Sequence, residues 1–143
     1  MNVNGGELVT SDVPVGPGKS SLLSVEGGGL KDFSEADLLI KFLDNGSYPD
    51  GDVVVSKINI NPSKLPNTDT IDTEYWIIDN YGNNINFSDI ESIEFTDLNG
   101  IEYLSKSGIE MFIRDRNSGA MDEWKSLEKA DSINIIDNSA IFN

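Results

Sequence analysis

Cysteine and histidine are both missing from this 143-residue chain. Without cysteine the protein can form no disulfide and has no thiolate nucleophile. Without histidine it lacks the commonest metal ligand and the side chain that most often moves protons at neutral pH. A Ser-His-Asp or Cys-His catalytic site is therefore excluded, and so are most zinc sites. The lack of disulfides does not fix the compartment, because a chain of this length can bury a core large enough to fold without them.

Basic residues are scarce as well. The chain has 10 lysines and arginines against 25 aspartates and glutamates, which gives a formal net charge of −15. A field of that sign repels phosphate groups, so we expect no nucleic-acid partner and no attraction to an anionic membrane surface. It is compatible with cations and neutral ligands, although the simplest interpretation is that the acidity keeps the domain soluble.

Long hydrophobic runs are absent too, since no stretch approaches the roughly 20 apolar residues that span a bilayer. The first residues, Met1 to Gly6, have neither the basic nor the apolar segment of a signal peptide. Two interpretations follow: a cytoplasmic protein, or a piece of a longer secreted chain. We favour the second because of the resemblance described below.

A tyrosine-tryptophan-isoleucine run is the most distinctive stretch that is present. Residues 73–82 contain Tyr75-Trp76-Ile77-Ile78 and end in an Asn/Gly turn. Because both faces of this segment are apolar, we predict a central strand of a sheet, covered on both sides. Trp76 is expected in the core beside Ile78, with Ile93 or Phe95 nearby.

Short alternating segments with Gly, Asn and Pro between them predict further strands. They are residues 20–25, 37–43, 52–60, 90–95, 109–116, 133–136 and 140–142. Segments 37–43 and 52–60 are predicted to pair as a hairpin, and a helix starting at Ser34 competes with the first of them. In 52–60 the apolar positions change parity around Ser56-Lys57, which indicates either a bulge there or a strand that is two-faced at its start.

This pattern predicts an all-β fold, an antiparallel β-sandwich of the immunoglobulin or jelly-roll type. We expect one domain over residues 1–143, in which residues 1–19 form a loop or an edge strand. At most one or two short helices are expected, around Ser34 or Ser126.

Acidic turns suggest a site for Ca²⁺. Asp44, Asp50 and Asp52 flank the connection between two predicted strands, and Ca²⁺ prefers hard oxygen ligands on flexible loops. The spacing is not that of an EF-hand, and Asp, Asn and Gly are also ordinary turn residues. Calcium ligands and plain turns therefore both remain open, and plain turns are the expectation.

Carboxylates on predicted strands could serve a small hydrolase, the third and weakest hypothesis. With so many acidic residues, pairs arise by chance, and the sequence singles none out. We predict that Glu74, Glu91 and Glu94 are solvated surface residues and that the protein is not an enzyme.

Aromatic residues near predicted loops could form a glycan site. Trp124, Tyr48, Tyr81 and Tyr103 are the candidates, because flat rings stack on sugar faces while nearby Asp and Asn side chains bond hydroxyl groups. The alternative is that these rings cover the ends of the core.

The last two thirds of the chain resemble a known kind of domain. The matching residues are Gly51 to Val55, Tyr75 to Gly82, Phe87, Ile93-Glu94-Phe95, Arg114 to Asn117 and Trp124 to Leu127. They resemble accessory β-sandwich domains near the C-termini of large secreted multidomain proteins of Bacteroidetes-type bacteria. The resemblance implies a non-catalytic module, secreted or at the cell surface, that spaces or supports neighbouring domains. The alternative is a carbohydrate-binding module that directs its parent protein to a neutral glycan.

Overall fold

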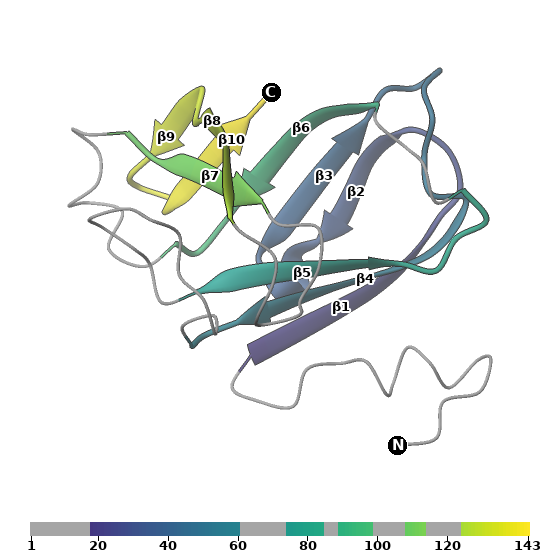
Figure 1. The fold of residues 1–143 in the computed structure, drawn as a ribbon, viewed down its shortest axis with the longest axis horizontal. Coiled ribbons are helices and arrows are strands. Elements are labelled where there is room, and N and C mark those ends of the chain that lie inside the picture. Colours follow the sequence, from purple (N-terminus) through teal and green to yellow (C-terminus); the bar gives the residue numbers. More distant parts are fainter. Residues whose placement is uncertain (1–17, 61–73, 85–88, 99–107, 114–123) are drawn as a thin grey trace.

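The computed structural model describes residues 18–60, 74–84, 89–98, 108–113 and 124–143. Within them the chain forms ten strands and one short 3₁₀ turn (Figure 1). The strands are β1 (Gly18–Val25), β2 (Gly29–Phe33), β3 (Leu38–Phe42), β4 (Gly51–Ile58), β5 (Tyr75–Asn80), β6 (Ile90–Phe95), β7 (Glu110–Ile113), β8 (Lys125–Lys129), β9 (Ser132–Asn134) and β10 (Ser139–Phe142). The 3₁₀ turn, η2 (Ser34–Ala36), separates β2 from β3.

These strands form three antiparallel sheets. Their orders are β1-β4-β5, β2-β3-β6-β10-β9 and β7-β8, and neighbouring strands within each sheet run antiparallel. The predicted all-β antiparallel class is therefore confirmed. The narrower assignment to an immunoglobulin-like or jelly-roll-like sandwich stays a prediction.

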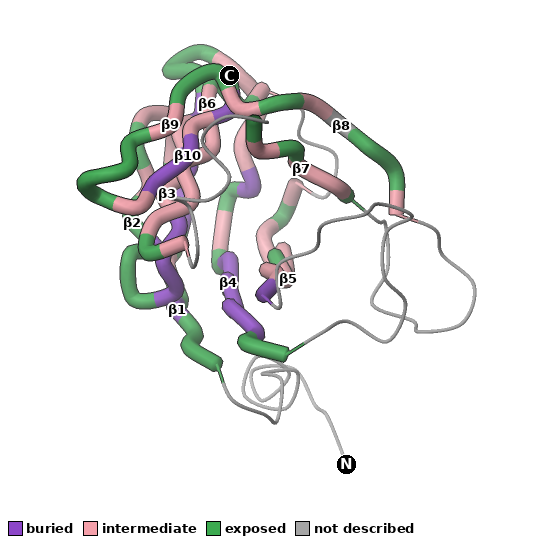
Figure 2. Tube along the Cα trace, turned by 90° about the vertical axis from the view of Figure 1, so that its left-hand side faces the viewer, coloured by how far each residue is buried: buried purple, intermediate pink, exposed green. Residues whose placement is uncertain are grey.

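The hydrophobic core joins the two larger sheets. Its buried members are Val25, Phe33, Ala36, Leu38, Ile40, Phe42, Val53 and Val55. Because successive side chains of a strand point to opposite faces, the alternate residues of β3 and β4 supply most of this set. Buried stretches of β3, β4 and β10 are visible in Figure 2, between more exposed turns and edges.

Among the described strands, β4 is the central strand of the first sheet and β5 lies at an edge, so for this part of the chain the prediction that residues 75–81 form a central strand is wrong. All residues from Val53 to Ile58 are buried, which makes β4 the strand that is covered on both faces. The two-faced interpretation of its parity change is thus confirmed, because β4 pairs with both neighbours without a register shift. Trp76 does pack against the core beside Phe95, as expected, with ring centroids 4.7 Å apart. The expectation that Ile78 lies in the core beside it is wrong, because Ile78 is 42% exposed.

The predicted hairpin between residues 37–43 and 52–60 is also wrong. β3 pairs with β2 and β6, whereas β4 pairs with β1 and β5, so the connection between β3 and β4 crosses from one sheet to the other. The sequence shows two alternating segments but not their partners. β2 was not predicted, because its Gly29 start and mixed Lys-Asp sequence are atypical of a strand.

Helix content is confined to η2 in the part of the chain that the structure describes, close to the predicted position at Ser34. Ser126 lies in β8, so a helical turn there is wrong. No helix among the described residues is long and apolar enough to cross a membrane.

The predicted Asn/Gly turn after β5 packs against the start of β4. Asn83 donates its backbone N–H to the Asp50 carbonyl at 2.9 Å, and the Asn80 side chain accepts the Gly82 N–H at 2.8 Å. A Cβ atom on Gly82 would lie 2.1 Å from the carbonyl oxygen of Pro49, so only glycine fits here.

Candidate functional site

A lysine lies inside the protein at the end of β4. Lys57 shares a face of the strand with Val53 and Val55, which belong to the core, and only 3% of its side chain is exposed. A buried ammonium group is costly unless oppositely charged or hydrogen-bonding groups surround it. Lys57 is therefore the natural starting point for a functional site.

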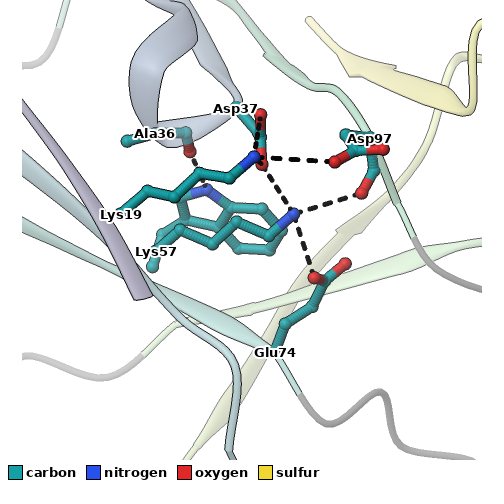
Figure 3. Close-up of polar contacts among 7 residues, drawn as sticks. Lys19, Ala36, Asp37, Lys57, Glu74 and Asp97 are labelled. Atoms are coloured by element: carbon teal, nitrogen blue, oxygen red, sulfur yellow. Dashed lines mark hydrogen bonds and ion pairs between the residues drawn. The ribbon is translucent and has the colours of Figure 1, made fainter. Parts of the chain in front are cut away.

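Three oxygen atoms from different segments surround the Lys57 ammonium. Its Nζ atom lies 2.9 Å from Asp37 Oδ2, 3.0 Å from Glu74 Oε2 and 3.1 Å from the Asp97 carbonyl oxygen (Figure 3). The exposed fractions of the two carboxylate side chains are 9% for Asp37 and 1% for Glu74. An ammonium has three donors, and these three acceptors match that number.

The backbone around η2 fixes the position of Asp37. The residue adopts a left-handed conformation, with φ at 56°, at the end of the 3₁₀ turn. Aspartate tolerates this region better than most residues. The Asp37 N–H donates to the Ser34 carbonyl at 3.0 Å, and the Asp37 carbonyl accepts the Thr96 N–H at 3.0 Å. Both bonds hold the carboxylate toward the end of β4.

A second lysine reaches the same carboxylate from β1. Lys19 lies directly opposite Lys57 in the register of β1 and β4, and its Nζ atom lies 3.1 and 2.9 Å from the two oxygens of Asp37. Like charges in opposite positions repel each other, and Asp37 between them removes that penalty. The Lys19 Nζ atom also lies 3.7 Å from a carboxylate oxygen of Asp97.

This geometry changes the acidity of two groups. Burial alone raises the pKa of the Asp37 carboxyl, but hydrogen bonds and charges from Lys19 and Lys57 outweigh it and hold that pKa below its ordinary value. The hydrogen bond to Asp37 is the main cause of the Lys19 pKa being raised, while partial burial opposes it.

Trp76 covers the Lys57 amine from β5. The two residues are direct cross-strand partners, and Nζ lies 5.2 Å from the indole ring centroid, within the range of a cation–π contact. The indole N–H donates to the carbonyl of Ala36 at 2.8 Å, next to Asp37 in the chain. One aromatic side chain thus contacts the amine and braces the turn that carries the carboxylate.

We call Lys19, Asp37, Lys57, Glu74 and Asp97 the lysine cluster. It places an amine and two carboxylates within hydrogen-bonding distance in a site shielded from solvent, an arrangement that can transfer protons or join the groups chemically. The prediction that Glu74 is a solvated surface residue is wrong, whereas Glu91 is indeed partly exposed. The sequence signal for Lys57 was the parity change in β4, because it placed a charged residue on the same face of the strand as buried valines.

The structure describes three of the four predicted glycan-binding residues. Tyr48 is half-buried against the core, which agrees with the alternative that it covers the core end. Trp124 is half-buried and meets Tyr75 edge to face, with ring centroids 6.4 Å apart. Tyr81 is half-buried and donates its backbone N–H to the Asp52 carbonyl at 2.8 Å. Tyr103 lies outside the described residues.

The predicted calcium ligands are all exposed. Asp44 follows β3, Asp50 has a left-handed backbone with φ at 52°, and Asp52 lies on β4. Asp44 lines an open hollow with Leu43, Asn45, Gly46 and Asp89. No group of three or more acidic side chains among the described residues is placed to hold a metal ion, and calcium binding by the three aspartates stays a prediction.

Asp89 has a structural role that the sequence did not reveal. Its carboxylate accepts the Ser47 N–H at 2.6 Å and its carbonyl accepts the Leu43 N–H at 3.0 Å, which fixes the connection between the sheets.

Comparison of the chain with protein-family models, with curated proteins and with solved structures found no match. The resemblance to secreted accessory domains therefore stays a prediction.

Proposed function

We propose that the chain is a non-catalytic structural module that spaces or supports neighbouring domains of a secreted or cell-surface protein. One observation carries this proposal: three charged groups of the lysine cluster, Lys57, Asp37 and Glu74, lie inside the protein, where they connect parts of the fold. A site for a soluble substrate or ligand needs such groups to be accessible. The Lys57, Glu74 and Asp37 side chains are instead almost fully enclosed.

The cluster supports this role through the segments that it joins. Lys19 comes from β1, Lys57 from β4 and Glu74 from the residue before β5, while Asp37 belongs to the connection between β2 and β3. The contacts thus link the first sheet to the turn that begins β3 of the second. Such cross-links favour a rigid body, which is what a spacer between domains requires.

The test is to measure the distance that the chain maintains between two partners. The protein is placed between two fluorescent reporter domains, and the distribution of energy transfer is compared with that of a Gly/Ser linker of equal length. A folded spacer gives a narrow distribution, whereas a flexible linker gives a broad one. A distribution as broad as that of the linker would contradict the proposal.

A glycan-binding module is the second candidate, and the pair of Trp124 and Tyr75 favours it. Both residues are half-buried, and their rings meet edge to face. Aromatic rings at a protein surface suit a sugar ring. The net charge of −15 favours a neutral polysaccharide over an acidic one.

Retention on immobilised neutral and acidic polysaccharides separates the two candidates. A structural module is retained by neither. Retention by a neutral polysaccharide that Trp124→Ala abolishes, with the fold intact, would favour the glycan-binding module. Tyr48→Ala is the control, because Tyr48 packs against the core and its loss should affect stability rather than retention.

A further inference from the structure

The lysine cluster brings together an amine and a carboxyl group that can react with each other. Lys57 Nζ lies 2.9 Å from Asp37 Oδ2, and neither side chain is more than 9% exposed. We propose that these two side chains condense to an amide, an isopeptide cross-link between β4 and the turn before β3. The cross-link does not depend on a spacer role, and its test is independent of polysaccharide retention.

The proposed step is a condensation without oxidation or reduction. The nitrogen of Lys57 forms a bond to Cγ of Asp37, and one Cγ–O bond of the carboxyl group breaks. Two hydrogens of the ammonium leave with that oxygen as one water molecule. An ammonium and a carboxylate, with charges that cancel, become a neutral amide, so atoms and charge balance without any further reactant.

Glu74 is placed to carry the protons. Its Oε2 atom lies 3.0 Å from Lys57 Nζ, within the distance required of a general base. It takes one proton from the ammonium, which frees the nitrogen to attack, and a second proton after the nitrogen has added to Cγ. It delivers both protons to the departing oxygen and ends the reaction as it began. Because Glu74 contacts the reacting nitrogen, it is the catalytic residue of this step.

Lys19 is placed to stabilise the intermediate. When the nitrogen adds to Cγ, negative charge builds up on the oxygens of Asp37, and the Lys19 ammonium lies 2.9 and 3.1 Å from them. Lys19 itself is the poorer nucleophile, because 47% of its side chain is exposed and its charge remains solvated. This assignment leaves Lys57 as the amine that reacts.

The surroundings favour the reaction in two ways. The fold holds the two groups in contact, which replaces an encounter in solution by a reaction within one molecule. Burial of an ammonium and a carboxylate is costly, and the neutral amide removes that cost. Trp76 adds to both effects, because its ring covers the amine while its N–H braces the turn at Ala36.

The decisive measurement is the mass of the intact, folded protein. We expect a mass lower than that of the sequence by one water molecule. Trypsin cannot cleave after an acylated lysine, so the digest should contain peptide 32–41 joined to peptide 42–64. Fragmentation should place the junction at Asp37 and Lys57.

Variants identify the reacting groups. Glu74→Gln keeps both partners but removes the proton carrier, and Lys57→Arg removes the nucleophile; both should have the full mass of their sequences. Lys41→Arg is the matched control, because Lys41 forms an ion pair of similar length with Glu91 at the surface, and it should retain the missing water. Circular dichroism verifies that each variant is folded. Should a variant not fold, the peptide map of the wild-type protein decides the question alone.

Several results would overturn the cross-link. A folded wild-type protein with its full mass has no amide. A missing water that persists in Glu74→Gln and Lys57→Arg arises elsewhere in the chain. Ring closure at Asp50-Gly51 also releases water, but it leaves peptides 32–41 and 42–57 separate, and that map would equally exclude the proposal.

Discussion

Two lysine–carboxylate pairs of nearly equal length lie in opposite surroundings. Lys57 Nζ is 2.9 Å from Asp37 Oδ2 inside the protein, and Lys41 Nζ is 2.8 Å from Glu91 Oε1 at the surface, where both side chains are 44% exposed. The distances are alike, so solvent access must account for any difference in what the pairs contribute. Water screens the surface pair, whereas the buried pair depends on its protein partners. An ion pair therefore has to be judged by its surroundings as well as by its length.

The largest expected effect comes from removing the buried ammonium. In the Glu74→Gln background, where the two groups stay unlinked, Lys57→Met should lower the free energy of unfolding by about 3–5 kcal/mol, because the buried Asp37 carboxylate loses the charge that pairs with it. Chemical denaturation of Glu74→Gln and of the double variant Glu74→Gln/Lys57→Met measures the difference. A loss under about 1 kcal/mol, as is typical of exposed pairs, would contradict the distinction between the two pairs.

The second largest loss of stability is expected from removing the Trp76 ring that covers Lys57. Trp76→Ala removes a core contact with Phe95 and the ring over Lys57, and should cost about 3 kcal/mol. Trp76→Phe is the control, since it keeps a ring but not the hydrogen bond to Ala36, and it should be affected less. Equal melting temperatures of Trp76→Ala and wild type would show that the residue does not support the cluster.

In a variant in which Asp37 and Lys57 stay unlinked, acid should reduce the stability that the ionised Asp37 carboxylate contributes. In Glu74→Gln, which keeps the two groups unlinked, the lowered pKa of Asp37 means that the unfolded chain takes up a proton more readily than the folded one. The stability from Asp37 is therefore complete above its ordinary pKa of 3.8 and is lost as the pH falls below that value toward the folded pKa.

The measurement compares Glu74→Gln with the double variant Glu74→Gln/Asp37→Asn. Their difference in unfolding free energy should shrink as the pH falls through this range, while contributions of the other carboxylates cancel. A difference that does not change with pH would mean that Asp37 is not a paired carboxylate in the folded variant.

The smallest effect is expected at the surface. Lys41→Met should leave the unfolding free energy unchanged within experimental error, at low and at high salt, because both partners exchange their contact for water. Thermal denaturation in the two buffers checks this. A loss as large as that of Lys57→Met would remove the basis of the comparison.

The sequence predicts individual strands better than their neighbours. Alternation identified β3 and β4, because that pattern depends only on which face of a strand is buried. Their sheets could not be predicted, since pairing depends on contacts between distant segments. The apolar run of β5 suggested a central strand. Its side chains instead have different contacts, because Trp76 packs against the core and Tyr75 meets the ring of Trp124.

The lysine cluster shows the same limit. The parity change at Ser56-Lys57 marked an unusual position, and the strand is indeed buried on both faces there. The residues that pair with Lys57 could not be found from sequence. Asp37 lies in a left-handed turn, and Glu74 lies just before the first residue of β5, so neither belongs to a strand pattern. One buried carboxylate among so many acidic residues leaves no trace in the composition.

The sequence separation of Asp37 and Lys57 has a mechanical consequence. The two residues are 20 positions apart, so an amide between them closes a ring that contains all of β3 and most of β4. Under tension applied at the two ends of the chain, the ring cannot open. The contour length released on unfolding would then be shorter by about 70 Å, since an extended chain spans about 3.3–3.6 Å per residue. The core of β3 and β4 would carry load without being drawn out.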